Sequence, residues 1–229
     1  AGLLALARRL PHTLRHQERR AWLPNELTGP GSPWLIAGKT MGIIGLGTLG
    51  QAIAARACAF GMRVIGRGRK PERGVPAGVD RVVAREDLHL LLQESDVIVL
   101  AAPWTPGTHQ ILDASAIEVM KPGAIVINVA RGQLVDESAL AGALMSGRLG
   151  GAVLDVFENE PLPLASSFWL MPNVIITPHT AGFRTGHFDA VMSLFSENLR
   201  RFERGAELLN AVDLEAGVKV PADQRDGLE

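Results

Sequence analysis

The chain has 229 residues, of which 47% are hydrophobic and 21% charged, and its formal net charge is −1. This composition is ordinary for a globular α/β protein, and the low net charge argues against a nucleic-acid or anionic-membrane partner. The sequence contains no apolar run long enough to span a membrane. The one cysteine, Cys58, excludes an intramolecular disulfide and is expected to be a packed thiol. No signal peptide is evident, so the predicted location is the cytoplasm.

The first 38 residues do not read as an independent domain. Residues 2–10 carry leucines at helical spacing, which predicts an amphipathic helix that Pro11 closes or kinks. A stretch with three arginines follows at 15–20; a solvated face is the favoured interpretation, and an anion site is the alternative. Residues 24–33 hold three prolines and two glycines, which predicts an extended connector.

The next stretch has the pattern of a strand, a glycine turn, a helix and a second strand. The expected elements are a strand at 41–44, a helix at 49–60 and a strand at 63–65. Gly45, Gly47 and Gly50 give the spacing G-x-G-x-x-G. The first glycine permits a tight turn, the second lets the backbone approach a pyrophosphate, and the third allows close packing of helix and strand. The helix N-terminus would attract the phosphates, so we predict dinucleotide binding; a tight turn without a ligand is the alternative.

The end of the second strand bears on which dinucleotide is bound. NAD-binding proteins of this kind carry an acidic residue there, which accepts hydrogen bonds from the ribose 2′-hydroxyl. In this chain Arg67 stands near that position, and none of residues 64–71 is Asp or Glu. Arg67, helped by Arg69 or Lys70, could pair with the 2′-phosphate of NADP. We therefore predict a preference for NADP(H), with NAD(H) possible if these cations are solvated loop charges.

Strands and helices continue to alternate along the chain. Further strands are expected at 81–83, 96–101, 124–129, 151–156 and 174–177, and helices at 86–93, 114–120, 137–146 and 191–204. Asp113 and Asp136 stand where each would cap a helix N-terminus. The strand at 96–101 is apolar without alternation, as a parallel sheet requires. The pattern predicts an α/β fold with a doubly wound parallel sheet.

Polar residues follow the last three strands, at the sheet edge where ligands collect in such folds. Arg131 follows the fifth strand, Asp155, Glu158 and Glu160 follow the sixth, and His179 follows the seventh. Arginine can hold a carboxylate, histidine can protonate a carbonyl oxygen as hydride reaches its carbon, and a carboxylate can orient the histidine. Together they predict hydride transfer to an α-keto acid. Singly, each could be a salt bridge, a solvated charge or a structural histidine.

Four segments resemble the D-isomer-specific 2-hydroxyacid dehydrogenase family, which includes phosphoglycerate dehydrogenases and glyoxylate/hydroxypyruvate reductases. They are GLGTLGQAIAARACAFGMRV, NVARGQLVDESAL, GAVLDVFENEPLP and PNVIITPHTAG, in family order. The resemblance implies a Rossmann-type NAD(P)-dependent oxidoreductase of small 2-keto or D-2-hydroxy acids, without a metal. It implies that Arg131 holds the substrate carboxylate and polarises the carbonyl, and that His179 is the acid/base with Glu160 as its partner.

The resemblance also implies a cofactor site. Thr48 and Leu49 would lie under the pyrophosphate, beside the three glycines of the turn. The residues that would flank the adenosine and phosphate side are Ala102, Pro103 and Thr108. Those that would contact the nicotinamide half are Ala130, Asp155, His179, Ala181 and Gly182.

Family members have a second domain that precedes the cofactor domain and is completed by the C-terminus. Ala1 aligns near the crossover, so about one domain's worth of sequence is expected to be missing. We expect 1–183 to be the dinucleotide-binding domain, with an interdomain helix at 2–10 and an arm at 11–38. Within that arm, residues 22–34 resemble the family's dimer contact, which implies a homodimer. Residues 184–229 would complete the missing domain. Apolar stripes on 2–10 and 191–202 would then lack a partner and promote self-association.

Two alternatives to an active dehydrogenase stay open at this point. One is a dinucleotide-sensing binding protein, because corepressors with this fold and much the same triad exist. The other is a non-catalytic remnant that merely folds. Turnover of glyoxylate or hydroxypyruvate by the full-length gene product would separate the enzyme from both. The fragment alone is expected to bind cofactor but to turn over little substrate, and the sequence does not choose among small keto acids.

Overall fold

The computed structural model describes residues 1–22, 32–68, 74–213 and 218–219. The chain divides into two compact units, Ala1–His179 and Thr180–Glu229. The first unit contains a large sheet with its covering helices. The second contains one long helix, α7 (His187–Glu203), and a short antiparallel pair, β8 (Val212–Asp213) with β9 (Val218–Lys219).

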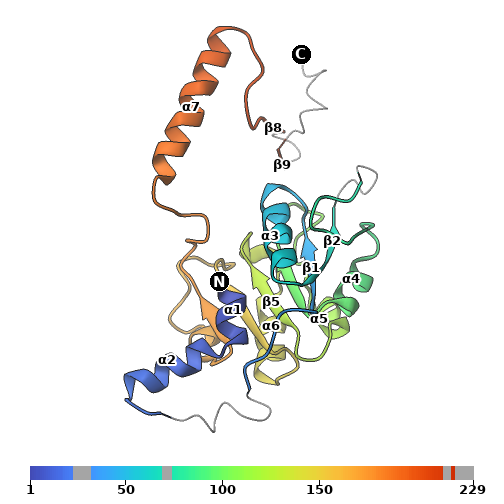
Figure 1. Ribbon diagram of the computed structural model, residues 1–229, viewed down its shortest axis with the longest axis vertical. Helices are drawn as coiled ribbons and strands as arrows, with labels where there is room; N and C mark the ends of the chain where they lie inside the picture. Colours follow the sequence, from blue (N-terminus) through green and yellow to red (C-terminus); the bar gives the residue numbers. More distant parts are fainter. Residues whose placement is uncertain (23–31, 69–73, 214–217, 220–229) are drawn as a thin grey trace. The chain divides into compact units, whose positions relative to one another are not determined.

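Seven parallel strands form the centre of the first unit, in the order β3-β2-β1-β4-β5-β6-β7 (Figure 1). Their bounds are β1 Thr40–Ile44, β2 Arg63–Arg67, β3 Arg81–Val83, β4 Val97–Leu100, β5 Ile125–Asn128, β6 Gly151–Leu154 and β7 Val174–Ile176. The chain runs outward from β1 to β3 and then returns to β4 on the other side of β1. Ligands of such sheets bind at this reversal, outside the carboxyl ends of the strands. The predicted doubly wound α/β fold is confirmed.

Helices cover both faces of the sheet and bury two apolar cores. The helices of this unit are α1 Gly2–Ala7, α2 Leu10–Glu18, α3 Thr48–Ala59, α4 Leu88–Glu94, α5 Ala114–Val119 and α6 Glu137–Met145, with single turns η4 Gly132–Leu134 and η5 Ser167–Leu170. One core joins α4, α5 and α6 to the sheet through side chains such as Leu91, Ile117 and Leu140. The other joins α1 and α3 to the opposite face through Leu6 and Ala54. Because both faces are covered, β1 and β4 are buried along their whole length.

Two aspartates fix the starts of α5 and α6. The carboxylate of Asp113 accepts a hydrogen bond from the backbone N–H of Ala116 at 2.8 Å, and Asp136 accepts one from Ala139 at 3.0 Å. These backbone hydrogen bonds stabilise the charged carboxylates and lower the pKa of both aspartates. The predicted N-caps are confirmed.

The N-terminal helix differs from the prediction. It ends at Ala7 instead of continuing to residue 10, and Pro11 lies in the first turn of a second helix, α2. Proline is tolerated there because the first N–H groups of a helix have no intrahelical partner. Leu3 and Leu6 of α1 are buried on the sheet together with Val153. The expectation that the stripe on 2–10 lacks a partner was therefore wrong for Leu3, Leu6 and Ala7, whereas Leu10 is exposed.

Two further expectations, for Cys58 and for the C-terminal helix, differ from the structure, and a third falls mostly outside the described residues. Cys58 is exposed, not packed, because the buried face of α3 is formed by Gly50, Ala54 and Ala57. The connector expected at 24–33 falls mostly on 23–31, which lie outside the described residues. The helix expected at 191–204 begins earlier, at His187, and its apolar side chains are exposed. Among the described residues, no helix is both long and apolar enough to cross a membrane.

We predict that Gly50→Ala destabilises the fold. A Cβ at this position would overlap the carbonyl oxygen of Gly45, which is backbone and cannot move aside cheaply. The free energy of unfolding, measured by urea denaturation, should fall by about 1–3 kcal/mol. Gly142→Ala is the matched control, because this exposed glycine lies inside α6 with nothing within 4 Å of an added Cβ. That substitution should stabilise by about 0.5–1 kcal/mol. Equal stability of Gly50→Ala and the unchanged protein would contradict the packing described.

Candidate active site

The glycine turn after β1 has a different constraint at each glycine. Gly45 has φ 105°, and an added Cβ would stand 2.6 Å from the backbone nitrogen of Ala102 at the end of β4. Gly50 packs on the carbonyl of Gly45. Gly47, by contrast, has nothing within 4 Å of the Cβ position, and it caps α3 without a side-chain hydrogen bond. The turn thus leaves open backbone at the N-terminus of a twelve-residue helix, which is the arrangement that suits a pyrophosphate.

The other residues expected near the dinucleotide occupy the surrounding strand ends. Thr48 and Leu49 form the exposed first turn of α3, and Ala102 is buried at the end of β4. The hydroxyl of Thr108 donates to the carbonyl of Pro103 at 2.8 Å and accepts from the Thr105 N–H at 2.8 Å. The side chain of Thr108 therefore holds the turn after β4 in shape.

Arg67 lies at the end of β2, and its guanidinium is held by a neighbour that the sequence analysis missed. Its Nε and Nη2 atoms donate to the carbonyl oxygen of Arg85 at 2.9 and 2.8 Å. Burial lowers the pKa of Arg67, and the charge of Arg85 lowers it further. Arg85 follows β3, and β3 pairs with β2 so that Val83 stands beside Arg67. That pairing, which the residue pattern alone does not report, places a second cation here. Arg69 lies outside the described residues.

His179 and Glu160 form an ion-pair geometry at the ends of β7 and β6. The distance from His179 Nδ1 to Glu160 Oε2 is 2.7 Å, and the other oxygen of Glu160 accepts from the N–H of Phe157 at 3.0 Å. His179 has a left-handed backbone, φ 54°, and its N–H donates to the carbonyl of Asp155 at 2.8 Å. With Nδ1 directed at the carboxylate, Nε2 is the ring nitrogen placed to exchange a proton with another molecule.

Arg131 stands on a loop that is fixed by a buried asparagine. The side chain of Asn128, the last residue of β5, donates to the carbonyl of Arg131 at 2.8 Å and accepts from the N–H of Ala130 at 3.1 Å. Asn128 is 1% exposed. The sequence analysis did not single it out, although a polar residue inside the apolar strand 124–129 was a usable signal, because buried polar groups are hydrogen-bonded.

The structure brings Arg131, Glu160 and His179 to one cavity of about 280 Å³. The residues that line it are Arg131, Gly132, Gln133, Phe157, Glu158, Glu160 and His179. Gly132 permits this closeness, because an added Cβ would overlap the backbone of Phe157 and Glu158. The loops after β5 and β6 are therefore in direct backbone contact. A guanidinium, an imidazole and a carboxylate share one small space, as hydride transfer to a keto acid would need.

The carboxylates around the cavity differ in their ionisation. Partial burial would raise the pKa of Glu160, but hydrogen bonds to His179 and to the Phe157 N–H outweigh it and lower the pKa overall. Burial raises the pKa of Glu137, which accepts from the Glu158 N–H at 2.7 Å. Among the described residues no group of three His, Cys, Asp or Glu side chains is placed to hold a metal ion.

Asp155 is buried and serves as an anchor. Its side chain accepts a hydrogen bond from the Thr177 hydroxyl, and its carbonyl holds His179. Ala181 and Gly182, also expected at the nicotinamide half, belong to the second unit, so the structure does not place them relative to this cavity.

Residues 1–181 match the family described as "D-isomer specific 2-hydroxyacid dehydrogenase, NAD binding domain". The chain is 43% identical over 189 residues to a glyoxylate reductase of Pyrococcus horikoshii, a match that covers 81% of this chain and 53% of that protein. It therefore spans about half the length of this relative.

Two solved structures are also similar. One is an NADPH-dependent glyoxylate/hydroxypyruvate reductase of Sinorhizobium meliloti in complex with NADP and sulfate: TM-score 0.82, 34% identity, 94% of this chain and 66% of that one. The other is a D-isomer specific 2-hydroxyacid dehydrogenase of Xanthobacter autotrophicus Py2 in complex with NADPH and MES: TM-score 0.81, 38% identity, 94% of this chain and 85% of that one.

The lowered pKa of Glu160 predicts a pH dependence of stability. Its stabilising effect is fully present above the ordinary pKa of glutamate, about 4.3, and is lost as the pH falls through the depressed folded-state value. We expect the difference in unfolding free energy between the unchanged protein and Glu160→Gln to shrink as the pH is lowered below about 4.3.

Urea denaturation at a series of pH values, followed by tryptophan fluorescence, measures this difference. Glu118→Gln controls for the loss of one charge, because Glu118 is exposed on α5, away from the residues that line the cavity. A difference for Glu160→Gln that stayed constant or grew toward acid pH would show that the ion-pair geometry contributes no such stabilisation.

Proposed function

The chain belongs to the D-isomer-specific 2-hydroxyacid dehydrogenase family, and on this premise we propose that the protein reduces a small 2-keto acid, of the glyoxylate and hydroxypyruvate class, with a nicotinamide dinucleotide. The observation that carries the proposal is the convergence of Arg131, Glu160 and His179 on one cavity. The activity named for the similar reductases supports the substrate class. The corepressor alternative finds no support in the relatives described above.

We assign the dinucleotide to the glycine turn and the neighbouring strand ends. The open backbone at Gly47 and the N-terminus of α3 suit the pyrophosphate, which Thr48 and Leu49 would flank. Ala102, Pro103 and Thr108 would adjoin the adenosine side, and Ala130 and Asp155 the nicotinamide side, together with Ala181 and Gly182. A bound reduced dinucleotide supplies the hydride.

The chain's own residues would complete the reduction. Arg131 would hold the substrate carboxylate through paired hydrogen bonds and draw charge toward the carbonyl oxygen. As hydride reaches the carbonyl carbon, His179 would pass the Nε2 proton to the oxygen, which yields the 2-hydroxy acid. Glu160, 2.7 Å from Nδ1, would orient the ring so that Nε2 is the nitrogen turned toward the substrate.

The wider assignments are also proposals. Residues 1–183 would act as the dinucleotide-binding domain and 184–229 as a segment that completes a substrate domain. The exposed apolar side of α7 supports such a contact, because an amphipathic helix of seventeen residues is stabilised mainly by packing. The homodimer and the cytoplasmic location stay predictions from the sequence.

We predict that His179→Ala in the complete protein lowers the rate of glyoxylate or hydroxypyruvate reduction about 10²–10⁴-fold, because the proton donor is lost. The rate is followed by the absorbance of the reduced nicotinamide. His89→Ala is the control, since His89 is exposed on α4 and outside the cavity, and it should keep full activity. Unchanged turnover by His179→Ala would refute the assignment, and the absence of turnover by the unchanged complete protein would refute the proposed reaction.

We further propose that NADPH is preferred over NADH, and that Arg67→Asp reverses the preference. Arg67 at the end of β2 could pair with the 2′-phosphate, whereas an aspartate would repel it and accept hydrogen bonds from a free 2′-hydroxyl. NADP and NADPH in the two solved structures support this choice. Fluorescence titration with each reduced dinucleotide gives both dissociation constants. Arg56→Asp, in the last turn of α3, is the control for charge. NADH binding as tightly as NADPH to the unchanged protein would contradict the proposal.

A further inference from the structure

A second cavity lies at the amino ends of the strands, opposite the carboxyl ends where the glycine turn stands. It measures about 120 Å³ and is lined by Leu6, Arg9, Pro11, His12, Arg15, Trp34, Ile125, Gly150, Pro172 and Asn173. Ile125 begins β5, and Gly150 and Asn173 immediately precede β6 and β7. These are amino ends of strands, so the cavity is separate from the proposed dinucleotide site at the carboxyl ends.

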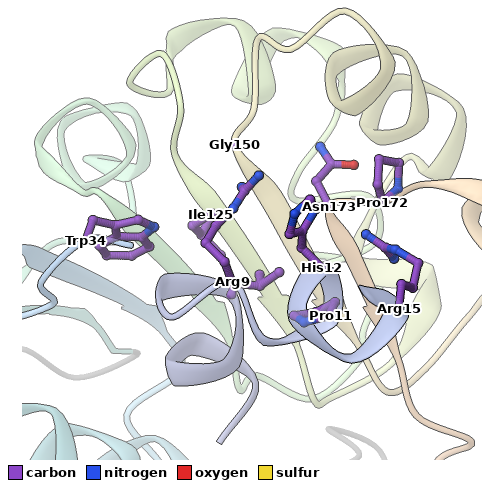
Figure 2. A pocket seen from close by; sticks show the side chains of 10 residues that line it. Arg9, Pro11, His12, Arg15, Trp34, Ile125, Gly150, Pro172 and Asn173 are labelled. Carbon is purple, nitrogen blue, oxygen red and sulfur yellow. The ribbon is translucent and has the colours of Figure 1, made fainter. Parts of the chain in front are cut away.

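Three of the side chains that line this cavity are those of arginine or histidine. Figure 2 shows the nitrogen-bearing ends of Arg9, His12 and Arg15 in a row that also includes Asn173. Of the ten described residues that line the cavity, none is acidic. The segment that supplies the bases, residues 8–20, holds five arginines and two histidines but one glutamate, in a chain whose net charge is −1. Positive charge is thus gathered in this segment, although the chain as a whole carries a net charge of −1.

Arg9 is held in position by its backbone. It has φ 58° and ψ 28°, a left-handed conformation uncommon for arginine, at the break between α1 and α2. Its N–H donates to the carbonyl of Leu6 at 3.0 Å, and its carbonyl accepts from the N–H and the hydroxyl of Thr13 at 3.0 and 3.1 Å. The Nε atom of its guanidinium is buried and has no hydrogen-bond partner among the described residues. A buried donor without a partner is costly unless a ligand satisfies it.

The remaining walls limit what could bind. Leu6, Trp34, Ile125 and Pro172 are apolar and contribute no charge. His12 is fixed against His16, with ring centroids 4.4 Å apart. A small space with apolar walls and guanidinium groups matches a compact oxyanion, because the planar guanidinium fork pairs with phosphate through charge-assisted hydrogen bonds.

We propose that this cavity, named here the amino-edge cavity, binds a phosphate-type oxyanion between Arg9 and Arg15. The ion is either free inorganic phosphate or the phosphate group of a small phosphomonoester. The favoured interpretation of the basic stretch as a solvated face thus gives way, for Arg15, to the anion-site alternative. Arg19, the C-cap of α2, is not among the lining residues and keeps a solvated role.

Calorimetric titration tests the proposal. Sodium phosphate and glycerol 3-phosphate are titrated in turn into the complete chain, with sodium chloride holding the ionic strength constant. Arg9→Asn removes the guanidinium while asparagine tolerates the left-handed backbone. This variant and Arg15→Ala should each weaken phosphate binding about tenfold, the loss of one charge-assisted hydrogen bond. Arg19→Ala, which removes the same charge outside the cavity, should bind phosphate as the unchanged protein does.

The outcomes separate clearly. If both cavity variants bind inorganic phosphate and glycerol 3-phosphate more weakly, the site accepts phosphomonoesters as well as free phosphate. If only the binding of inorganic phosphate is weakened, the site is assigned to the free ion. Undiminished binding in the double variant Arg9→Asn/Arg15→Ala would place the anion elsewhere, such as the glycine turn, and overturn the proposal. No phosphate binding by the unchanged chain would also overturn it. If circular dichroism shows that Arg9→Asn does not fold, Arg15→Ala decides alone, because Arg15 is an exposed side chain.

Discussion

The rest of the structure depends on contacts of backbone against backbone at the carboxyl edge of the sheet. Gly45 meets the end of β4, Gly50 meets Gly45, and Gly132 meets the loop after β6, each at a distance that no Cβ allows. These contacts draw the strand ends together without side chains between them. The glycine turn after β1 and the cavity lined by Arg131, Glu160 and His179 both follow from this packing, since each exists only where glycine permits two main chains to touch.

Hydrogen bonds then turn this close packing into defined side-chain positions. Buried Asn128 donates to the carbonyl of Arg131 and so fixes the loop that carries this residue. The N–H of Phe157 donates to the Glu160 carboxylate, and the carbonyl of Asp155 accepts from the N–H of His179. The supporting partners are mostly backbone groups or buried side chains. Because these partners are already fixed, little entropy is lost when substrate binds. The side chains of His179, Glu160 and Arg131 are therefore ordered before substrate arrives.

The sequence predicted most of the fold because the strands are apolar runs bounded by turn signals, and residues 81–83 form β3 as expected. The residues after the strands could be grouped because a parallel sheet places all carboxyl ends of its strands on the same side. Arg131, Glu160 and His179 were singled out in this way. Arg85 and Asn128 were missed for a different reason. The position of Arg85 follows from the pairing of β3 with β2, which periodicity does not report. The polar Asn128 inside an apolar run indicated that a partner was needed, but its partners, Ala130 and Arg131, are set by the loop after β5. The break after Ala7 was missed because Pro11 is as compatible with the start of a helix as with its end.

The break between α1 and α2 connects the carboxyl ends of the strands with their amino ends. The apolar side of α1 packs on β6, where Gly2 lies against Val153, and β6 leads directly to Asp155, whose carbonyl holds His179. The left-handed turn at Arg9 then ends α1 and directs the basic residues of α2 to the amino edge. A continuous helix through residue 10 would have kept the apolar contact but carried Arg9 and Arg15 to other positions. The interruption therefore lets one short segment support the proposed catalytic strand and form the basic cavity at the opposite edge.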